Sequence, residues 1–269
     1  MREGLDRLLF LLDLERIDRD LFRGANPTEG HGRVFGGQVA SQALRAAAYT
    51  VEADHRVNSL HAYFLRPGRP AMPIVYSVDR IRDGKSFTTR RVVAIQDGEA
   101  IFNLDASFHK AEAGGEFQQQ CGLDWVPPPD EVRRDDHWGP HRQAIDFREV
   151  EPPRPPSTRI QWVKADGTLP DDPVVHACVL AYASDSGPVG AARRPLRDGE
   201  DEWERFMSAS LDHTMWFHRP VRADEWLLYD LQAVACSNAR GLARGTFWTR
   251  EGLLAISVCQ EALIRPVNR

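Results

Sequence analysis

The sequence lacks the features that mark several large classes of protein. It holds only four cysteines in 269 residues, with no C-x-x-C pair and no histidines at zinc-finger spacing. A disulfide scaffold and a structural zinc site are therefore not expected. No stretch approaches the ~20 uninterrupted apolar residues of a membrane-spanning helix, and charged residues closely flank the short apolar run at residues 8–12. We expect a cytoplasmic protein with neither a signal peptide nor a membrane partner.

An excess of basic charge is also missing. The chain carries 34 lysine and arginine residues against 39 aspartate and glutamate residues, a formal net charge of −5 at pH 7. A protein that binds nucleic acid through a general basic field needs the opposite balance, so no nucleic-acid partner is expected. With 42% hydrophobic and 27% charged residues, the composition is typical of a soluble globular protein with a folded core.

The usual signatures of covalent and nucleotide chemistry are absent as well. The sequence contains no G-x-S-x-G elbow, no Walker loop and no G-x-G-x-x-G motif. Ser184, Asp185 and Ser186 stand at the end of a predicted helix and form no nucleophile signature. We therefore expect no metal and no other cofactor.

The first half of the chain predicts a helix followed by antiparallel strands. Between residues 75 and 109, runs rich in Val, Ile, Phe and Thr are separated by Asp83-Gly84 and Asp97-Gly98. Asp-Gly pairs between such runs favour hairpin turns, because the turn needs a positive φ. The alanine-rich run at residues 38–51 predicts a helix, and its many small side chains suggest close packing against the sheet.

The second half repeats this order with matching residues. A helix is predicted at residues 174–185, and strand-like runs follow it. Along the sequence, Gly98 and Gly252 are separated by the same number of residues as Arg90 and Arg244. This regular spacing favours a tandem duplication of one α+β unit, although unrelated antiparallel sheets can share turn chemistry. The expected organisation is an N-terminal unit at residues 1–112, a linker at 113–143 and a C-terminal unit at 144–269.

Polar residues interrupt strands of the second half that otherwise look buried. Asp212 lies within SLDHTMWF, Gln260 interrupts AISVCQEALI, and Ser237 lies in QAVACSNARG. An acid in an apolar strand is unfavourable unless it is hydrogen-bonded or functional. Each residue alone could equally be an ordinary edge or surface position, so their occurrence together is what suggests a site.

A series of motifs places the chain beside one known family. They are RVFGGQVASQAL (33–44), SLHAYFLRPG (59–68), RDGKSFTTRRVVAIQDGEAIF (82–102), ASFHK (106–110), LDHTMWFHRP (211–220), EWLLYD (225–230), ARGLARGTFWTREG (239–252) and QEALIR (260–265). On these motifs the chain resembles the type II acyl-CoA thioesterases, the TesB-like group with two fused hotdog units. The resemblance covers nearly the whole chain apart from the linker.

The resemblance implies an α+β fold of tandem hotdog units, in which each long helix is wrapped by a curved antiparallel sheet. It also implies hydrolysis of fatty acyl-CoA to free fatty acid and CoA without a metal or prosthetic group. In this family an Asp, a Gln and a hydroxyl residue position the attacking water. The Asp falls on Asp212 and the Gln on Gln260. The family threonine is replaced by Val234 in this chain, and Ser237 is the nearby candidate for the missing hydroxyl.

The residues themselves suggest how such a reaction could proceed. Thioester hydrolysis requires a water molecule beside a base, and hydrogen-bond donors for the developing oxyanion. Asp212 could accept the proton of the water while Gln260 orients it. The backbone amides of Gly37 and Gln38 could act as oxyanion donors at the positive end of the first predicted helix, although Gly37 could equally mark only a tight helix entry. His61 is an accessory candidate in the substrate site, and His213 is a second accessory candidate.

Two other functions remain open from the sequence. A hotdog protein that binds acyl-CoA or an acyl carrier without hydrolysing it would fit Val234 in place of the family hydroxyl. A hydratase on the same fold would pair its Asp with a His a few residues on, but Asp212 and His213 are adjacent and point to opposite faces of a strand. Exposed sheet edges also lead us to expect a homo-oligomer.

Overall fold

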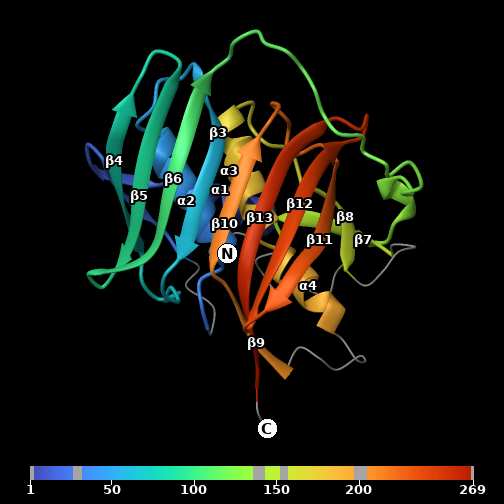
Figure 1. Cartoon of the computed structure of the whole chain (residues 1–269). Coiled ribbons are helices and arrows are strands. Elements are labelled where there is room, and N and C mark those ends of the chain that lie inside the picture. The colour runs from blue at the N-terminus through green and yellow to red at the C-terminus, as the bar shows by residue number, and fades with distance from the viewer. Residues whose placement is uncertain (1–2, 27–31, 136–142, 152–156, 197–204, 268–269) are drawn as a thin grey trace.

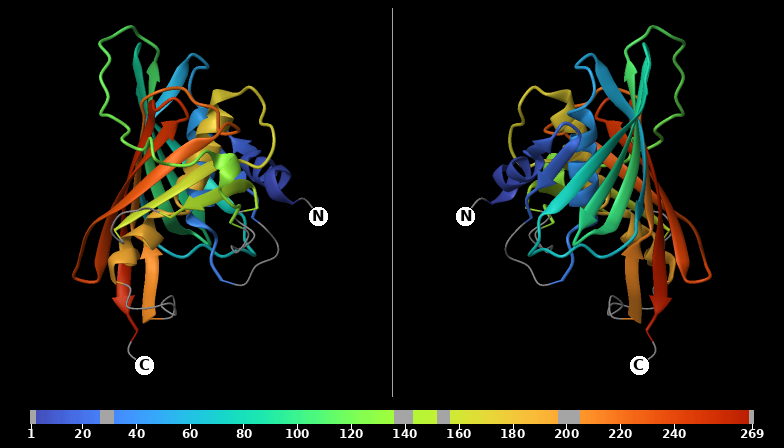
Figure 2. Two further views of the ribbon diagram at one scale, coloured as in Figure 1. Left: turned by 90° about the vertical axis from the view of Figure 1, so that its right-hand side faces the viewer. Right: turned by 90° about the vertical axis from the view of Figure 1, so that its left-hand side faces the viewer.

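The computed structural model describes residues 3–26, 32–135, 143–151, 157–196 and 205–267. These residues form an antiparallel sheet of 13 strands that curves around two central helices (Figures 1 and 2). The strands of the first half are β1 (Glu15–Asp18), β2 (Leu21–Gly24), β3 (His55–Phe64), β4 (Ile74–Asp83), β5 (Phe87–Gln96) and β6 (Glu99–Lys110). The strands of the second half are β7 (Ile145–Val150), β8 (Thr158–Ala165), β9 (Phe206–Ser210), β10 (Asp212–Phe217), β11 (Leu227–Ser237), β12 (Arg240–Thr249) and β13 (Leu254–Pro266).

The order of the strands across the sheet shows the duplication directly. It runs β1-β2-β4-β5-β6-β3-β10-β13-β12-β11-β8-β7, with β9 paired to β13. Each strand of the first half therefore has a counterpart at the mirrored place in the second half. The strands β3 and β10 lie side by side at the centre, where His61 is opposite Thr214 (Figure 1). The predicted double-hotdog fold is confirmed, while the boundaries of the units and the linker stay a prediction.

The helices α2 (Gly36–Ala48) and α3 (Pro173–Ser184) lie next to each other in the hollow of the sheet (Figure 2). They run in opposite directions, and Arg45 near the end of α2 forms a salt bridge of 3.1 Å with Asp172 at the start of α3. Asp172 also caps α3, because its side chain accepts the N–H of Val174 at 2.9 Å. The helix predicted at residues 174–185 is confirmed, and α2 begins two residues earlier and ends three residues earlier than predicted.

Two shorter helices complete the described helical structure. The helix α1 (Gly4–Leu12) packs on α2 and α3, and its buried face consists of leucines. The helix α4 (Pro188–Arg193) follows α3 closely and packs on β11, β12 and β13. The short 3-10 helices η1 (Pro129–Glu131) and η3 (Arg194–Leu196) lie in the connections. The core therefore lies between the concave face of the sheet and these helices.

Turns occur at both predicted Asp-Gly pairs and also at Glu251-Gly252. Asp97 and Gly98 have φ values of 52° and 75° between β5 and β6, and Gly252 has a φ of 76° between β12 and β13. The connection at Asp83-Gly84 joins β4 to β5 without the predicted positive φ at either residue. Positive φ is the conformation that glycine adopts without steric cost, so the turns at Gly98 and Gly252 follow from local chemistry.

The region predicted as a linker packs against the second half. The side chain of Gln118 donates to the backbone carbonyl of Gly252 at 2.9 Å, and Trp162 Nε1 donates to the carbonyl of Pro127 at 2.8 Å. Leu123 and other apolar residues of this region cover a small apolar cluster on β8, β11 and β12. The connection between the halves is thus anchored to the sheet at several points.

Two expectations about missing features can be compared with the structure. All four cysteines are free thiols, which agrees with the absence of a disulfide pattern in the sequence. Among the described residues, no helix is long and apolar enough to cross a membrane.

Candidate active site

A group of polar side chains, three of them buried and one half-buried, lies where the end of α3 meets β9, β10 and β13. It consists of Asp185, Ser210, His213 and Gln260, and we refer to these four residues as the polar cluster. His213 is 0% exposed, Gln260 1% and Asp185 9%. Polar groups this deeply buried require hydrogen-bond partners, and a cluster of them in a core marks a candidate site.

Each member of the polar cluster comes from a different element. Asp185 is the C-cap residue directly after α3, and Ser210 is the last residue of β9. In β10 the side chains alternate, so that His213 and Met215 are buried while Asp212 is not. Gln260 is buried on the neighbouring strand β13. The site therefore depends on packing between the last helix turn and three strands.

Gln260 links the acid and the hydroxyl of the cluster. Its Nε2 donates to Asp185 Oδ1 at 3.1 Å and to Ser210 Oγ at 2.8 Å. The hydroxyl of Ser210 also donates to Asp185 Oδ1, at 3.0 Å. A carboxylate, an amide and a hydroxyl thus converge within hydrogen-bond distance of one another, which is an arrangement that can hold a water molecule.

His213 holds the amide of Gln260 in one orientation. Its Nδ1 lies 2.5 Å from Gln260 Oε1, and its Nε2 lies 2.8 Å from Ser184 Oγ. Because a carbonyl oxygen only accepts, Nδ1 must be the donor in the first contact. A neutral ring then has an unprotonated Nε2, which can accept the one proton of the Ser184 hydroxyl in place of the carbonyl of Ala181, which lies 2.9 Å from the same oxygen. With Oε1 facing His213, the Nε2 of Gln260 is left to face Asp185 and Ser210.

Burial changes the acid–base properties of this pair. Burial raises the pKa of Asp185, while His213, the hydrogen bonds from Gln260 and Ser210, and the backbone N–H of Gly37 act in the opposite direction. Burial likewise lowers the pKa of His213, against the attraction of Asp185. A carboxylate with a raised pKa is a stronger proton acceptor once it is ionised. The environment of Asp185 therefore suits a general base.

The start of α2 closes the site from the side opposite the strands. A Cβ atom on Gly36 would lie 2.6 Å from Asp185 Oδ2 and 2.7 Å from Phe64 Cε1, and a Cβ on Gly37 would meet the backbone carbonyl of Tyr182. Protein atoms thus occupy the space beside both glycines. The close approach of α2 to the end of α3 requires glycine at these positions.

The carboxylate expected at Asp212 is not the one that meets Gln260. Asp212 Oδ1 accepts the backbone N–H of Glu261 at 2.6 Å, and its side chain lies on the face of β10 opposite His213. Gln260 lies in the predicted position within the buried strand, but its carboxylate partner is Asp185. The expected pairing of Asp212 with Gln260 is therefore corrected to Asp185 with Gln260.

The hydroxyl expected at Ser237 lies elsewhere too. Ser237 ends β11 at the hairpin to β12, opposite Arg240, and its side chain is exposed. Val234, which seemed to replace the family hydroxyl, is 53% exposed on the same strand. The hydroxyl that contacts Gln260 belongs to Ser210.

The three other predicted residues differ in their relation to the cluster. The N–H of Gly37 faces Asp185, so this residue does adjoin the site. The backbone N–H of Gln38 donates to Phe35 O at 3.1 Å, and its side chain donates to Asn26 Oδ1 at 2.7 Å. His61 is exposed on β3, where its ring packs edge-on against Trp216 at a centroid distance of 5.4 Å. Neither Gln38 nor His61 contacts the polar cluster.

Sequence reasoning gave no role to Asp185 or Ser210 and took His213 only as an accessory candidate. Asp185 ends an almost wholly apolar helix, and a carboxylate in that position is as notable as one in an apolar strand. The alternation along β10 places His213 on the same face as Met215, which was the available signal that His213, and not Asp212, points inward. Ser210 directly precedes the LDH tripeptide and carried no separate signal.

Comparisons with known proteins agree with this architecture. The sequence profile of the family described as acyl-CoA thioesterase matches residues 147–263, and that of the acyl-CoA thioesterase N-terminal domain matches residues 25–109. Mouse acyl-coenzyme A thioesterase 8 is 39% identical over 288 residues, covering 95% of this chain and 88% of the relative. Acyl-CoA thioesterase 2 of Haemophilus influenzae is 33% identical over 287 residues, covering 98% and 99%.

A solved structure extends the similarity to three dimensions. The acyl-CoA thioesterase II TesB2 from Mycobacterium marinum has a TM-score of 0.85 and is 40% identical, with 97% of this chain and 99% of that chain covered. The match thus spans both repeats and includes the strands that carry the polar cluster. From its sequence and its fold, the chain belongs to the acyl-CoA thioesterase family.

Proposed function

We propose that this protein hydrolyses the thioester of fatty acyl-CoA, releasing a fatty acid and CoA, with water activated by Asp185, Gln260 and Ser210. Membership of the family over nearly the whole chain supports the reaction. The contacts of Gln260 Nε2 with Asp185 Oδ1 and Ser210 Oγ are the observation that supports the assignment of these residues. The role expected for Asp212 passes to Asp185, and the role expected for Ser237 passes to Ser210.

In the proposed reaction a water molecule binds beside Asp185 and is oriented by Gln260 and Ser210. Its oxygen attacks the thioester carbonyl carbon while Asp185 accepts one of its protons. The tetrahedral intermediate then collapses, the carbon–sulfur bond breaks, and the proton held by Asp185 passes to the leaving sulfur, which returns the carboxylate to its starting state. The net change adds one water to one thioester and yields one carboxylic acid and one thiol. No covalent intermediate with the protein is needed, in agreement with the missing nucleophile motifs.

The start of α2 is the proposed location of oxyanion stabilisation. The positive end of the α2 dipole faces the cluster, where it favours a developing negative charge. The amide of Gly37 hydrogen-bonds to Asp185, so it orients the acid and is withdrawn from the role of oxyanion donor. The amide of Gln38 is withdrawn from this role because it donates to Phe35 O. His61 is withdrawn from the substrate site because it lies on an exposed part of β3.

The two alternative functions lose their sequence support. Non-catalytic binding was favoured by the apparent loss of the hydroxyl at Val234, but Ser210 supplies a hydroxyl beside Gln260. A hydratase needs a histidine that can exchange a proton with the substrate. Both ring nitrogens of His213 are engaged, one with Gln260 and one with Ser184. A cytoplasmic location and a homo-oligomeric state remain predictions.

A thiol-release assay tests the proposed function. Purified protein should release CoA thiol from acyl-CoAs when short, medium, long and branched chains are compared. The variant Gln260→Ala should lower kcat by about 10- to 100-fold with little change in KM, because an orienting group acts mainly in the transition state. A larger KM with unchanged kcat would instead place Gln260 in substrate binding. Tight binding of acyl-CoAs without any thiol release would contradict hydrolysis.

A further inference from the structure

The last carbonyl of α3 is held by a tyrosine from the sheet. The hydroxyl of Tyr229, on β11, donates to the backbone carbonyl of Ser184 at 3.0 Å. Both residues are 0% exposed. The final carbonyls of a helix have no partner within the helix, so a buried one needs a donor from elsewhere. Tyr229 supplies that donor at the residue that directly precedes Asp185.

This contact fixes the peptide group that leads into Asp185. The carbonyl of Ser184 and the N–H of Asp185 belong to one planar peptide unit. Holding the carbonyl oxygen therefore restricts the direction in which the Asp185 side chain leaves the backbone. At the other end of that side chain, Oδ1 accepts Gln260 at 3.1 Å and Ser210 at 3.0 Å. Asp185 is thus held through its backbone by β11 and through its carboxylate by β13 and β9.

The ring of Tyr229 has little freedom to move. It stacks on Phe247 of β12 with a centroid distance of 3.9 Å and an interplanar angle of 12°. On the same strand, a Cβ on Gly245 would lie 2.6 Å from Tyr229 Cε2, so the ring occupies the space beside this glycine. Because the hydroxyl oxygen lies on the axis of the ring, close packing of the ring also fixes this oxygen.

The chain that follows the acid packs closely on β11 as well. A Cβ on Gly187 would meet the side chain of Leu231 and would lie 3.6 Å from Tyr229 Cε1. Glycine at this position therefore allows the backbone after α3 to approach the strand. Asp185 thus stands in a short segment that contacts β11 at the carbonyl before it and at Gly187 after it.

The first half carries a tyrosine at the equivalent place with a different contact. Tyr76 lies on β4, the counterpart of β11 in the mirrored order of strands. Along the sequence, Tyr76 and Tyr229 are separated by the same number of residues as Arg66 and Arg219. Tyr76 is also 0% exposed, and its hydroxyl donates to Gln42 Oε1 of α2 at 2.7 Å. Only the tyrosine of the second half reaches the end of a helix, beside the acid.

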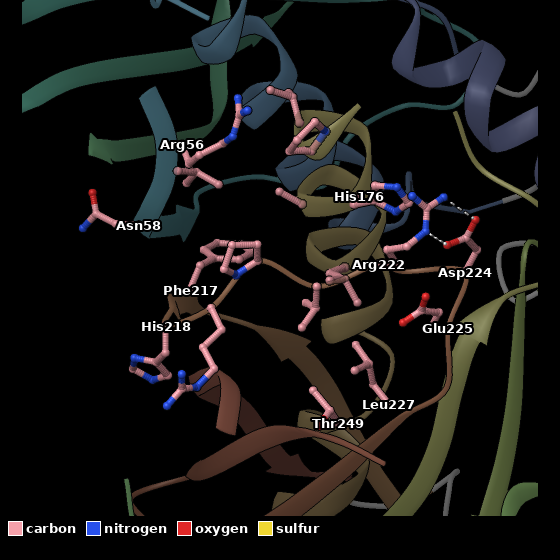
Figure 3. A pocket seen from close by; sticks show the side chains of 18 of the residues that line it. Arg56, Asn58, His176, Phe217, His218, Arg222, Asp224, Glu225, Leu227 and Thr249 are labelled. Carbon is pink, nitrogen blue, oxygen red and sulfur yellow. Dashed lines mark hydrogen bonds and ion pairs between the residues drawn. The ribbon is translucent and has the colours of Figure 1, made fainter. Parts of the chain in front are cut away.

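The opposite end of the helix pair is packed less closely. A cavity of about 1000 Å³ lies there, bordered by Leu44 and Ala48 of α2 and by Val174 and Ala177 of α3 (Figure 3). Tyr229 and the end of α3 take no part in its wall. The end of α2 thus borders open space, whereas the end of α3 is held by the sheet. Close packing therefore distinguishes the end that carries the polar cluster.

We propose that Tyr229 is a positioning residue for the hydrolysis, which holds Asp185, through the carbonyl of Ser184, in the place where its carboxylate meets Gln260. This inference rests on the proposed function, because it gives Tyr229 a part in that reaction. The hydroxyl acts through the backbone and takes no part in proton transfer. Burial and the charge of Asp185 both raise the pKa of Tyr229, so the hydroxyl keeps its proton and remains a donor.

The expected effect follows from the precision that a catalytic group needs. Productive geometry tolerates displacements of about 0.5 Å, and a displacement of about 1 Å can lower a rate by ~100-fold. Without the hydroxyl of Tyr229, the carbonyl of Ser184 is buried without its donor, so the peptide unit before Asp185 can rotate. A smaller fraction of molecules then holds the carboxylate in its productive place.

Removal of single hydroxyl groups tests the proposal by thiol release from the full-length protein. Tyr229→Phe keeps the stacked ring and removes the donor. Tyr76→Phe removes a matched buried hydroxyl from the counterpart strand and is the control. Tyr229→Phe is also combined with Asp185→Asn, and thermal unfolding is measured on every sample. If Tyr229→Phe fails to fold, Gly245→Ala takes its place, because the added Cβ displaces the ring and keeps the hydroxyl.

We expect Tyr229→Phe to lower kcat by about tenfold with KM within about threefold of the parent, since the lost contact affects the reacting geometry more than binding. Tyr76→Phe should lose a similar amount of thermal stability and keep kcat within about twofold. In the Asp185→Asn background, Tyr229→Phe should cause no further loss, because a positioning residue has no effect once the group that it positions is gone.

The outcomes that would overturn the proposal differ from those that concern the catalytic residues. Unchanged kcat in Tyr229→Phe, with Asp185→Asn slow, would refute positioning by Tyr229 and leave the proposed function intact. Equal losses of kcat in Tyr229→Phe and Tyr76→Phe would assign both tyrosines to the core alone. A further tenfold loss in the Asp185→Asn background would show that Tyr229 acts independently of the acid. Parental kcat in Asp185→Asn itself would refute the catalytic assignment, and the role of Tyr229 with it.

Discussion

The role of His213 leads to a prediction that separates orientation of Gln260 from general support of the fold. Replacing His213 by leucine removes the donor to Gln260 Oε1 and leaves this buried oxygen without its partner. The amide can then rotate and present Oε1 to Asp185, where two oxygens repel each other. Replacing His213 by asparagine keeps an N–H group near the position of Nδ1. The two variants thus differ mainly in whether the orientation of the amide is preserved.

The size of the effect follows from the hydrogen bonds involved. Leaving one buried polar group unsatisfied costs about 1–3 kcal/mol. The free energy that favours the productive orientation of the Gln260 amide should therefore fall by about the same amount. Since 1.36 kcal/mol corresponds to a factor of ten in rate, His213→Leu should lower kcat by about 10- to 100-fold. KM should change less than about threefold because His213 lies behind the reacting groups. His213→Asn should recover most of the lost turnover.

The pH profile supplies a readout that a purely structural role would not move. The hydrogen bond from Gln260 lowers the pKa of Asp185. Losing this hydrogen bond raises the pKa further, so the acid limb of kcat/KM should move to higher pH in His213→Leu. In His213→Asn the hydrogen bond is kept and the shift should be smaller.

The assay is steady-state thiol release between pH 5 and 9, with thermal unfolding measured on the same samples. Normal turnover and an unmoved acid limb in His213→Leu would refute the reasoning. A loss of activity that follows the loss of folded protein in both variants, without any shift of the limb, would assign His213 to the core alone.

Three further predictions concern neighbouring groups. Ser210→Ala should lower kcat by about tenfold and Ser210→Thr should restore it, as measured by thiol release, because the hydroxyl contacts both Asp185 and Gln260. Gly36→Ala should destabilise the protein by about 1–3 kcal/mol in urea unfolding and reduce turnover, because the added Cβ approaches Asp185 Oδ2 to 2.6 Å. The control is Gly98→Ala, since Gly98 has open space around it. This variant should lose stability because of the φ of 75° at this position, but it should keep its activity. In the unmodified protein the acid limb of kcat/KM should lie above the ordinary carboxyl value of 3.8, because burial raises the pKa of Asp185, and a limb at or below that value would contradict its role as base.

Much of the fold could be predicted because its signals are local or repeated. The turn at Asp97-Gly98 follows from residue chemistry, and the start of α3 follows from the cap at Asp172. The constant spacing between matching residues predicted the two units, which appear in the structure as a mirrored order of strands.

The candidate site could be predicted only in part, because it depends on contacts between distant segments. Gln260 was recognisable as a polar interruption of an apolar strand. Its partner depends on where the end of α3 packs against β13, and nothing local to Asp185 states that distance. Asp212 was the more visible acid, yet the alternation along β10 turns it away from the core and turns His213 inward. The alternation thus explains why Asp212 does not face Gln260, whereas the position of Asp185 beside Gln260 is set by long-range packing.

The most direct measurement compares Asp185→Asn with Asp212→Asn under identical conditions of thiol release. Both changes replace one carboxylate by an amide of the same size. The proposed chemistry predicts at least a ~100-fold lower kcat for Asp185→Asn, the scale of a lost general base, and turnover within about threefold of the parent for Asp212→Asn. Retained activity in Asp185→Asn together with a large loss in Asp212→Asn would contradict the central claim that the buried acid beside Gln260 activates the water.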